Sequence, residues 1–300
     1  MERDIYIRLG MLSNSIWIFI IAIAVVLVLF LKHRPRANYN RVPKIIWSYW
    51  DNPDKIPKSV KLCMESWKKH NPDYKIVLMN KKNFKGFVTI PPFIASHYQF
   101  HHNDSGFSDL LRLYALAEHG GVWMDSTILL KEPLDNWLFP RYGEFSGFYL
   151  DSFTKPGFPP VIESWFLACN KNSSFMKHWR DELIEIVNYP DVSKYIESRK
   201  KMGVDMQNIN DPTYLAIHVA AQKVLQLDKY PTDNFLFRKA EDGPFKYLTA
   251  AKWDSEKALR LACSDKKYQG FIMKMRGNER KVLEKEIDYD LSNERCGWLD

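Results

Sequence analysis

The sequence predicts an α/β domain over residues 42–300, preceded by a membrane anchor and linker over residues 1–41. Three observations lead to this fold class. Residues 9–31 carry no charge, residues 42–79 follow a strand–helix–strand pattern, and residues 107–130 combine a helix, a glycine turn and a buried strand. A strand–helix–strand unit followed by further helix–strand pairs is typical of a Rossmann-like fold.

The anchor is predicted at residues 9–31, because 23 residues without a charge are long enough to cross a bilayer. A cleaved signal peptide is the alternative, but the apolar run ends in basic residues and no small-residue cleavage site follows it. Basic residues are more numerous after the span than before it, which favours a single-pass protein with a cytosolic main domain. A lumenal domain is the other orientation, and sequons at Asn103 and Asn172 are compatible with it.

The composition limits the kinds of partner that the main domain can have. A hydrophobic content of 46% is ample for a packed core. A lysine-rich solvated surface explains most of the formal net charge of +7, and part of this charge suits an anionic partner. The sequence shows no zinc-finger spacing, RNP-like motif or arginine-rich arm, so no nucleic-acid partner is expected. The cysteines have no CxxC spacing and are expected to be mostly buried thiols, with a Cys263–Cys296 disulfide left open.

The domain is expected to open with a strand at residues 42–50. Pro57 then starts a helix, since proline is favoured in the first helical turn, and a second strand follows at residues 74–79. Neither a G-x-G-x-x-G pattern nor a Walker loop is present. A dinucleotide or ATP would therefore lack its usual phosphate cradle.

The central stretch places an acid at the end of a buried strand. Ser108 or Asp109 is expected to cap a helix, and Gly120-Gly121 ends it because glycine adopts left-handed conformations without steric cost. Residues 122–124 then form a short apolar strand, and Asp125 follows directly. Open α/β sheets bind ligands beyond the carboxyl ends of their strands. An acid at this position is expected to bind a metal or a nucleotide.

The later part of the chain is expected to become largely helical. Residues 145–150 and 161–169 are apolar segments separated by a loop rich in proline. Apolar residues at helical spacing predict a helix over residues 175–189, and Asp211-Pro212 is expected to start another. Beyond residue 252 the content of charged residues rises, and no element is assigned there from the sequence.

The stretch SDLLRLYALAEHGGVWMDST resembles the central signature of glycosyltransferases that share the DxD sugar-binding region. These include the yeast-type α-mannosyltransferases and the capsular polysaccharide synthesis proteins, a glycosyltransferase family 32-like group. The capsular proteins are the nearer match, because their acid motif often reads W-x-D-x-T. The ordered elements S-D-x-x-R, G-G and W-x-D, with KIIWSYWD near the start, carry the resemblance, which extends over about residues 42–245.

The resemblance implies a GT-A-type fold that binds a nucleotide-sugar and transfers the sugar, with retention, to a glycan or polysaccharide acceptor. It also implies a divalent cation, Mn²⁺ or Mg²⁺, held by Asp125. Trp47 matches the aromatic residue that stacks on the nucleotide base; a place in the hydrophobic core is the alternative for this side chain. The remaining implied roles are donor binding by Ser108, Asp109, Arg112 and Gly121, catalysis by Asp125 and Thr127, and acceptor binding by Trp50, Glu163, Ser164 and Trp165.

One departure from the family pattern concerns the second acid of the DxD motif. Thr127 stands at that position, and a hydroxyl is a poor substitute for a carboxylate at a hard cation. Metal binding is therefore left open, and so is a second interpretation, a catalytically silent anchored protein that binds a glycan or a nucleotide-sugar. The candidates for a late metal ligand are not separated by the sequence; they are Asp211, His218, Glu241 and Asp242.

Overall fold

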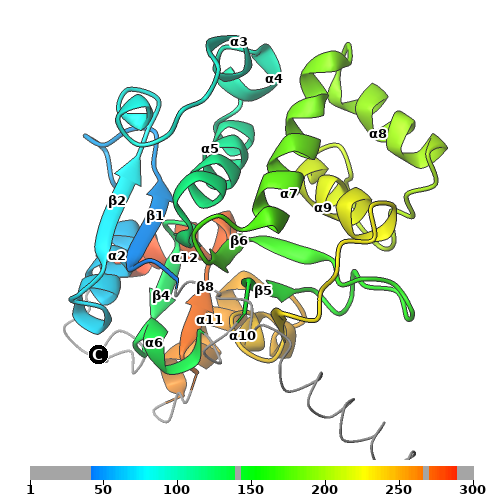
Figure 1. The fold of residues 1–300 in the computed structure, drawn as a ribbon. Coiled ribbons are helices and arrows are strands. Elements are labelled where there is room, and N and C mark those ends of the chain that lie inside the picture. Colours follow the sequence, from blue (N-terminus) through cyan, green and yellow to red (C-terminus); the bar gives the residue numbers. More distant parts are fainter. Residues whose placement is uncertain (1–41, 139–142, 266–269, 289–300) are drawn as a thin grey trace, which may run out of the picture. The chain divides into compact units, whose positions relative to one another are not determined.

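The computed structural model describes residues 42–138, 143–265 and 270–288, and confirms the predicted α/β class. A mixed six-stranded sheet lies at its centre, in the order β2-β1-β3-β6-β5-β7 (Figure 1). Its strands are β1 (Ile45–Tyr49), β2 (Lys75–Met79), β3 (Gly121–Met124), β5 (Phe145–Tyr149), β6 (Ile162–Cys169) and β7 (Phe235–Lys239).

The direction of the strands changes at the middle of the sheet. β1 pairs in parallel with both β2 and β3, whereas β6 runs antiparallel to β3 and to β5. The amino-terminal end of β6 therefore meets the carboxyl ends of β1 and β3 at one edge. A separate antiparallel pair consists of β4 (Ile128–Leu130) and β8 (Ile272–Lys274), and aligns Ile128 with Lys274.

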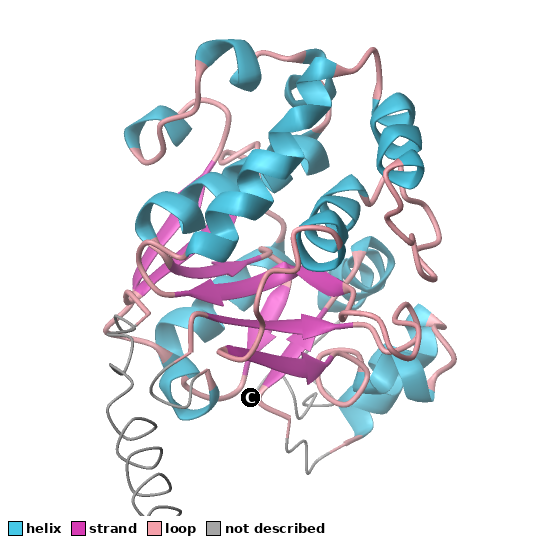
Figure 2. Ribbon diagram, turned by 45° about the vertical axis from the view of Figure 1, so that its right-hand side comes forward, coloured by secondary structure: helices cyan, strands magenta, loops and turns pink. Residues whose placement is uncertain are grey.

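Helices cover both faces of the sheet (Figure 2). One face is covered by α5 (Asp104–His119), α7 (Ser174–Ile184) and α9 (Ala216–Gln226). The other packs against α2 (Lys58–His70), α10 (Lys246–Ala250), α11 (Ser255–Ser264) and α12 (Gly277–Asp288). The remaining helices are η1 (Phe84–Gly86), α3 (Pro92–Ala95), α4 (Tyr98–His101), α6 (Leu134–Trp137), η2 (Glu185–Asn188) and α8 (Val192–Lys201).

Alternation along the strands divides the apolar residues between two cores. Trp47 and Trp123 lie in the core beneath α5, whereas Ile46 and Val122 lie in the core on the opposite face. Successive side chains of a strand point to opposite faces, so a sheet with helices on both sides buries both sets of side chains. The apolar run of β3 reflects this arrangement.

Helix α5 begins earlier than the sequence predicts. Asn103 is its cap, with a side chain that accepts a hydrogen bond from the backbone of Ser105, so neither Ser108 nor Asp109 starts the helix. The predicted glycine end is confirmed: Gly120 has a φ of 67°, and a Cβ there would lie 2.7 Å from the backbone of Asn170.

Two other expectations about the later chain are wrong. Helix α9 begins at Ala216 rather than at Asp211, whose carboxylate accepts a hydrogen bond from the backbone of Tyr214 and closes a turn. Strand β7 lies in the part of the chain that was expected to be largely helical, and β8 lies where no element was assigned. Both contain charged residues that interrupt the apolar pattern of a strand.

None of the helices in the described ranges combines the length and the hydropathy of a membrane span. The predicted span at residues 9–31 lies outside the described residues, as does Cys296 of the disulfide considered above. Cys63 and Cys169 are buried free thiols, as expected.

Candidate functional site

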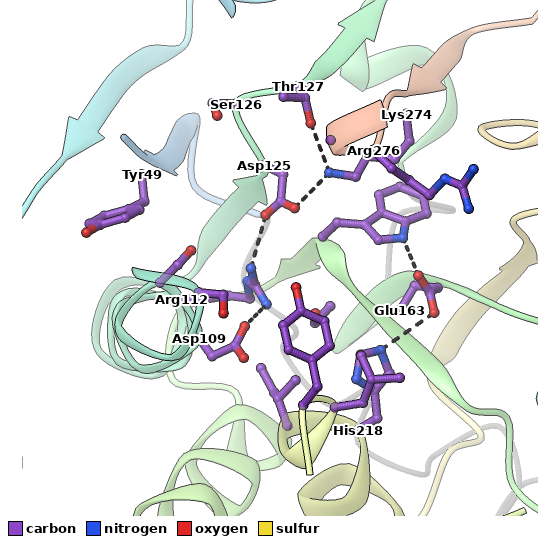
Figure 3. A pocket seen from close by; sticks show the side chains of 18 of the residues that line it. Tyr49, Asp109, Arg112, Asp125, Ser126, Thr127, Glu163, His218, Lys274 and Arg276 are labelled. Atoms are coloured by element: carbon purple, nitrogen blue, oxygen red, sulfur yellow. Dashed lines mark hydrogen bonds and ion pairs between the residues drawn. The ribbon is translucent and has the colours of Figure 1, made fainter. Parts of the chain in front are cut away.

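A cavity of about 1100 Å³ opens at the edge where β1 and β3 end. This is the edge at which α/β sheets bind ligands, and the antiparallel β6 brings its first residues to the same place. Figure 3 shows side chains from separate elements pointing toward one another across it. The lining includes Tyr49, Trp50 and Asp51 after β1, Ser108, Asp109 and Arg112 on α5, Asp125, Ser126 and Thr127 after β3, Glu163, Ser164 and Trp165 on β6, His218 on α9, and Lys274 and Arg276 at β8.

Arg112 links the two acids of the central stretch. Its guanidinium lies 2.5 Å from a carboxylate oxygen of Asp109 and 3.0 Å from one of Asp125. The side chain also lies over the ring of Trp123, at 5.0 Å from the ring centre, and the residue is only 4% exposed. A planar guanidinium can donate to two acids in fixed directions, so Arg112 sets the position of both carboxylates.

Asp125 is held by a second cation on its other side. The ammonium nitrogen of Lys274 lies 2.8 Å from Asp125 Oδ2 and 3.0 Å from the hydroxyl of Thr127. Burial alone would raise the pKa of Asp125, but Lys274 and Arg112 outweigh it and hold this pKa below its ordinary value. Burial raises the pKa of Asp109, although Arg112 opposes it. Asp125 is therefore an anion locked between two cations.

These residues do not form a fitting site for a divalent cation. Both oxygens of Asp125 are engaged by cationic groups, and the hydroxyl of Thr127 donates to the carbonyl of Met275 at 2.7 Å. Within the described ranges, no group of three or more His, Cys, Asp or Glu side chains could hold a metal ion. A hard cation needs several free oxygen ligands. The predicted role of Asp125 as a metal ligand does not agree with this arrangement.

Glu163 and His218 lie on the side of the cavity opposite Asp109 (Figure 3). The indole of Trp165 donates a hydrogen bond to Glu163, and His218 Nε2 lies 3.6 Å from Glu163 Oε1. His218 Nδ1 is buried and has no hydrogen-bond partner among the described residues. Polar groups are thus available on both sides of the cavity.

The chain matches the family described as "Capsular polysaccharide synthesis protein" over residues 29–196, more than half of its length. It belongs to this family. The match confirms the resemblance inferred from the signature. No curated protein matches the sequence.

Several solved glycosyltransferases are similar at low identity. One, "involved in the glycosylation of the major capsid of PBCV-1", is 11% identical; the match covers 80% of this chain and 98% of that chain, with a TM-score of 0.40. GlyE of Streptococcus pneumoniae is 14% identical, with 85% and 63% covered and a TM-score of 0.41. LgtC, solved with donor and acceptor sugar analogs, is 12% identical, with 81% and 95% covered and a TM-score of 0.39.

In this member of the capsular family, two predicted donor residues lie outside the cavity lining. Trp47 is 4% exposed; its indole donates to the carbonyl of Gly120 at 2.9 Å and stacks on His119. Gly121 packs against β1, where a Cβ would lie 2.8 Å from the carbonyl oxygen of Ile45. Trp47 sits two residues before the strand end, so its side chain enters the core instead of the cavity.

The aromatic side chains that reach the cavity from β1 are Tyr49 and Trp50. The Tyr49 hydroxyl donates to Asp51 at 2.9 Å, and burial together with this acid raises the pKa of Tyr49. Trp50 is half-buried and has the guanidinium of Arg280 over its ring at 5.2 Å. An aromatic platform therefore exists at the end of β1, two to three residues beyond the predicted one.

Lys274 and Arg276 are two cationic residues of the cavity that the sequence does not predict. Their only signal is a lysine and an arginine at alternate positions of the apolar run FIMKMR. Of the late candidates for a metal ligand, His218 alone lines the cavity, and it lies near Glu163 rather than Asp125. Asp211, Glu241 and Asp242 are not among the lining residues.

Proposed function

We propose that the cavity is the active site of a GT-A-type glycosyltransferase. In this proposal the protein transfers a sugar from a nucleotide-sugar donor to a glycan or polysaccharide acceptor, with retention at the anomeric carbon. One observation carries it: Arg112 joins Asp109 and Asp125 at the strand-end cavity, and Lys274 holds Asp125 from the other side. The family to which the chain belongs supports polysaccharide synthesis as the context.

The donor is expected on the side formed by β1, α5 and β3. Tyr49 or Trp50 offers an aromatic face to the base, since base–aromatic stacking depends little on base identity. Ser108 and Asp109 line the cavity about one helical turn before Arg112 on α5. A hydroxyl group of the ribose or of the sugar can donate a hydrogen bond to the Asp109 carboxylate there. Donor recognition thus uses the residues of the central signature.

The acceptor is expected opposite, near Glu163 and His218. In the transfer step the bond from the anomeric carbon to the diphosphate oxygen breaks, and its electron pair stays on the diphosphate. The acceptor hydroxyl oxygen forms the new bond to the anomeric carbon. With retention, the hydroxyl proton passes to a diphosphate oxygen on the same face of the sugar. Glu163 accepts hydrogen bonds in the cavity and can orient that hydroxyl.

A catalytically silent binder of the same ligands is the second candidate. It is favoured by the full pairing of Asp125, which leaves no free carboxylate oxygen at the predicted metal position. The enzyme must bind a nucleotide-sugar, whereas the silent protein binds a glycan or a nucleotide-sugar. Only the enzyme releases the nucleotide and lengthens a glycan.

The test is turnover by the full chain, purified in detergent micelles. A panel of uridine, guanosine, thymidine and cytidine nucleotide-sugars is assayed for nucleotide release, and nuclear magnetic resonance reads the configuration of any product. We expect one donor to be turned over and Asp125→Asn to abolish turnover. The control is Asp205→Asn, which breaks an ion pair with Lys155 away from the cavity lining. Binding without turnover of any donor would favour the silent binder.

We further propose that residues 9–31 anchor the protein as a single-pass membrane protein, with its main domain in the cytosol. The support is the uncharged apolar run and the basic residues that follow it. The full chain should remain with membranes after carbonate extraction. Protease added to sealed membrane vesicles of known orientation then reports the side on which the domain lies.

A further inference from the structure

Building on the proposed transferase activity, we infer that the ammonium of Lys274 takes the place of the divalent cation of DxD enzymes. Together with Arg276, it would neutralise the diphosphate that leaves the donor sugar. The ligand it recognises is a nucleoside diphosphate, and the reaction would need no metal. The inference concerns two residues that lie outside the central signature and outside the stretch matched to the family.

Lys274 is placed in the cavity by the pairing of β8 with β4. The residue is 8% exposed, and its ammonium contacts Asp125 and Thr127. These contacts use two of the three N–H groups of a lysine, and the described residues provide no partner for the third. A lysine that lines the cavity and keeps one free donor can bind an anionic oxygen there.

Arg276 follows two residues later and lines the same cavity. Its Nε and Nη2 atoms bind the carboxylate of Glu279, at 3.0 and 2.8 Å, so the guanidinium is fixed in direction. Its Nη1 atom has no partner in the described part of the chain. Arg276 also lies over the ring of Trp253, at 5.1 Å from the ring centre. A second positioned donor group therefore stands beside Lys274.

The position of Lys274 also explains why a metal fits poorly. A divalent cation bound to Asp125 would lie beside the ammonium that already contacts this carboxylate at 2.8 Å. Like charges this close repel strongly at the effective dielectric of a partly buried site. Thr127 supplies a neutral hydroxyl where the DxD pattern has an acid. The threonine in place of the second acid weakens a metal site, and its hydroxyl contacts the ammonium of Lys274 instead.

The cations are in place before a donor arrives. Ion pairs with Asp125 and Glu279 hold Lys274 and Arg276 in fixed positions. Charge that is positioned in advance stabilises a transition state without reorganisation at the moment of reaction. As the anomeric carbon–oxygen bond breaks, the electron pair moves onto the diphosphate, whose new charge meets these two cations. The acceptor oxygen bonds to the anomeric carbon, and its proton leaves on the diphosphate.

The first experiment compares turnover of the full chain in EDTA with turnover in Mn²⁺ or Mg²⁺. We expect the rates to agree within about twofold. Lys274→Met should lower kcat by about 100-fold or more, as loss of one positioned electrostatic group does in other enzymes, and added metal should not restore it. Lys239→Met is the matched control, because its ion pair with Asp151 is exposed and outside the cavity lining. Loss of activity in EDTA with recovery in Mn²⁺ would overturn the inference, as would normal turnover by Lys274→Met.

Two further variants distinguish loss of the Lys274 charge from loss of the fold. Lys274→Arg keeps the charge and should retain part of the activity. The double variant Thr127→Asp, Lys274→Ala restores the acidic pair and removes the ammonium, and should turn over donor only when Mn²⁺ is present. Metal-independent turnover by this double variant would contradict the role of Lys274. Thermal melting of each variant reports whether it is folded.

Binding separates this inference from the proposed transferase activity. If the wild-type chain turns over no donor, calorimetry with UDP and GDP still reads the cation site. Binding in EDTA that Lys274→Met weakens at least tenfold supports the inference while the transferase proposal fails. Binding that requires Mn²⁺, or no binding at all, overturns the inference.

Discussion

At the scale of single residues, Arg112 is the group on which the two acids of the central signature depend. It is 4% exposed and contacts Asp109 from its own helix and Asp125 from the following strand. Removing one partner from a buried ion pair leaves an uncompensated charge, which costs about 3–5 kcal/mol. The arginine of S-D-x-x-R therefore contacts the aspartate of its own motif and the aspartate of W-x-D.

We therefore predict that Arg112→Met lowers the free energy of unfolding by about 3 kcal/mol and weakens nucleotide binding. Lys194→Met, which breaks an exposed pair with Glu197, should cost less than about 0.5 kcal/mol. Chemical denaturation and calorimetry with nucleoside diphosphates measure the two effects. Equal stability of the two variants would show that Arg112 does not hold the acids.

Two tryptophans three positions apart should respond in opposite ways. Trp47 is buried in the core, so Trp47→Ala should cost about 3–5 kcal/mol in stability, while Trp47→Phe keeps nucleotide affinity. Trp50 lines the cavity, so Trp50→Ala should weaken nucleotide binding by about 1–3 kcal/mol with little loss of stability. Thermal melting and nucleotide titration of the three variants are the measurements. A nucleotide-binding defect in Trp47→Phe but not in Trp50→Ala would show that Trp47 is the residue that stacks on the nucleotide base.

At the scale of elements, the turn between α5 and β3 depends on glycine for two separate reasons. Gly121 has a φ of 99°, and a Cβ on it would meet the backbone of Ile45 at 2.8 Å. We predict that Gly121→Ala lowers stability by more than about 2 kcal/mol, since positive-φ strain alone costs about 1–3 kcal/mol. Gly157→Ala isolates that strain, because Gly157 has a φ of 83° and nothing within 4 Å. Denaturation of the two variants should show a larger loss for Gly121→Ala.

The elements that the sequence predicts well are those whose contacts are local. The helix, its glycine end and the strand before Asp125 follow from spacing and from glycine chemistry within one stretch. The start of α5 was misplaced because the cap, Asn103, precedes a polar first turn without apolar periodicity. Trp47 is expected at the end of the first strand but lies two residues before the end of β1, because apolar spacing does not define where a strand ends. Strand β8 was missed because its partner, β4, is remote in the sequence.

At the scale of the whole molecule, the late segment that carries Arg276 is tied to its neighbours by Glu279. This carboxylate is 2% exposed and accepts hydrogen bonds from Arg276 and from the hydroxyl of Ser255. Burial alone would raise the pKa of Glu279, but the contacts with Arg276 and Ser255 hold it below its ordinary value of 4.5. A carboxyl group whose pKa falls on folding contributes stability above its unfolded pKa, and that contribution is lost as the pH falls through the folded value.

Glu279→Gln should therefore cost about 2 kcal/mol at neutral pH, and the difference from the wild type should shrink as the pH falls below 4.5. Urea denaturation of the full chain across this pH range is the measurement. Glu256→Gln, in an exposed pair with Arg260, is the control and should show no such trend. A difference that is independent of pH would mean that the Glu279 charge does not stabilise the fold.

The contact between Lys274 and Asp125 joins positions 149 residues apart. During synthesis the signature leaves the ribosome well before its cationic partner does. If Lys274 neutralises the charge of the leaving diphosphate, a nascent or prematurely terminated chain has a nucleotide pocket that lacks this ammonium group. Such fragments would be inert toward the cell's activated sugars, and only chains that extend through β8 and fold it onto β4 would consume them.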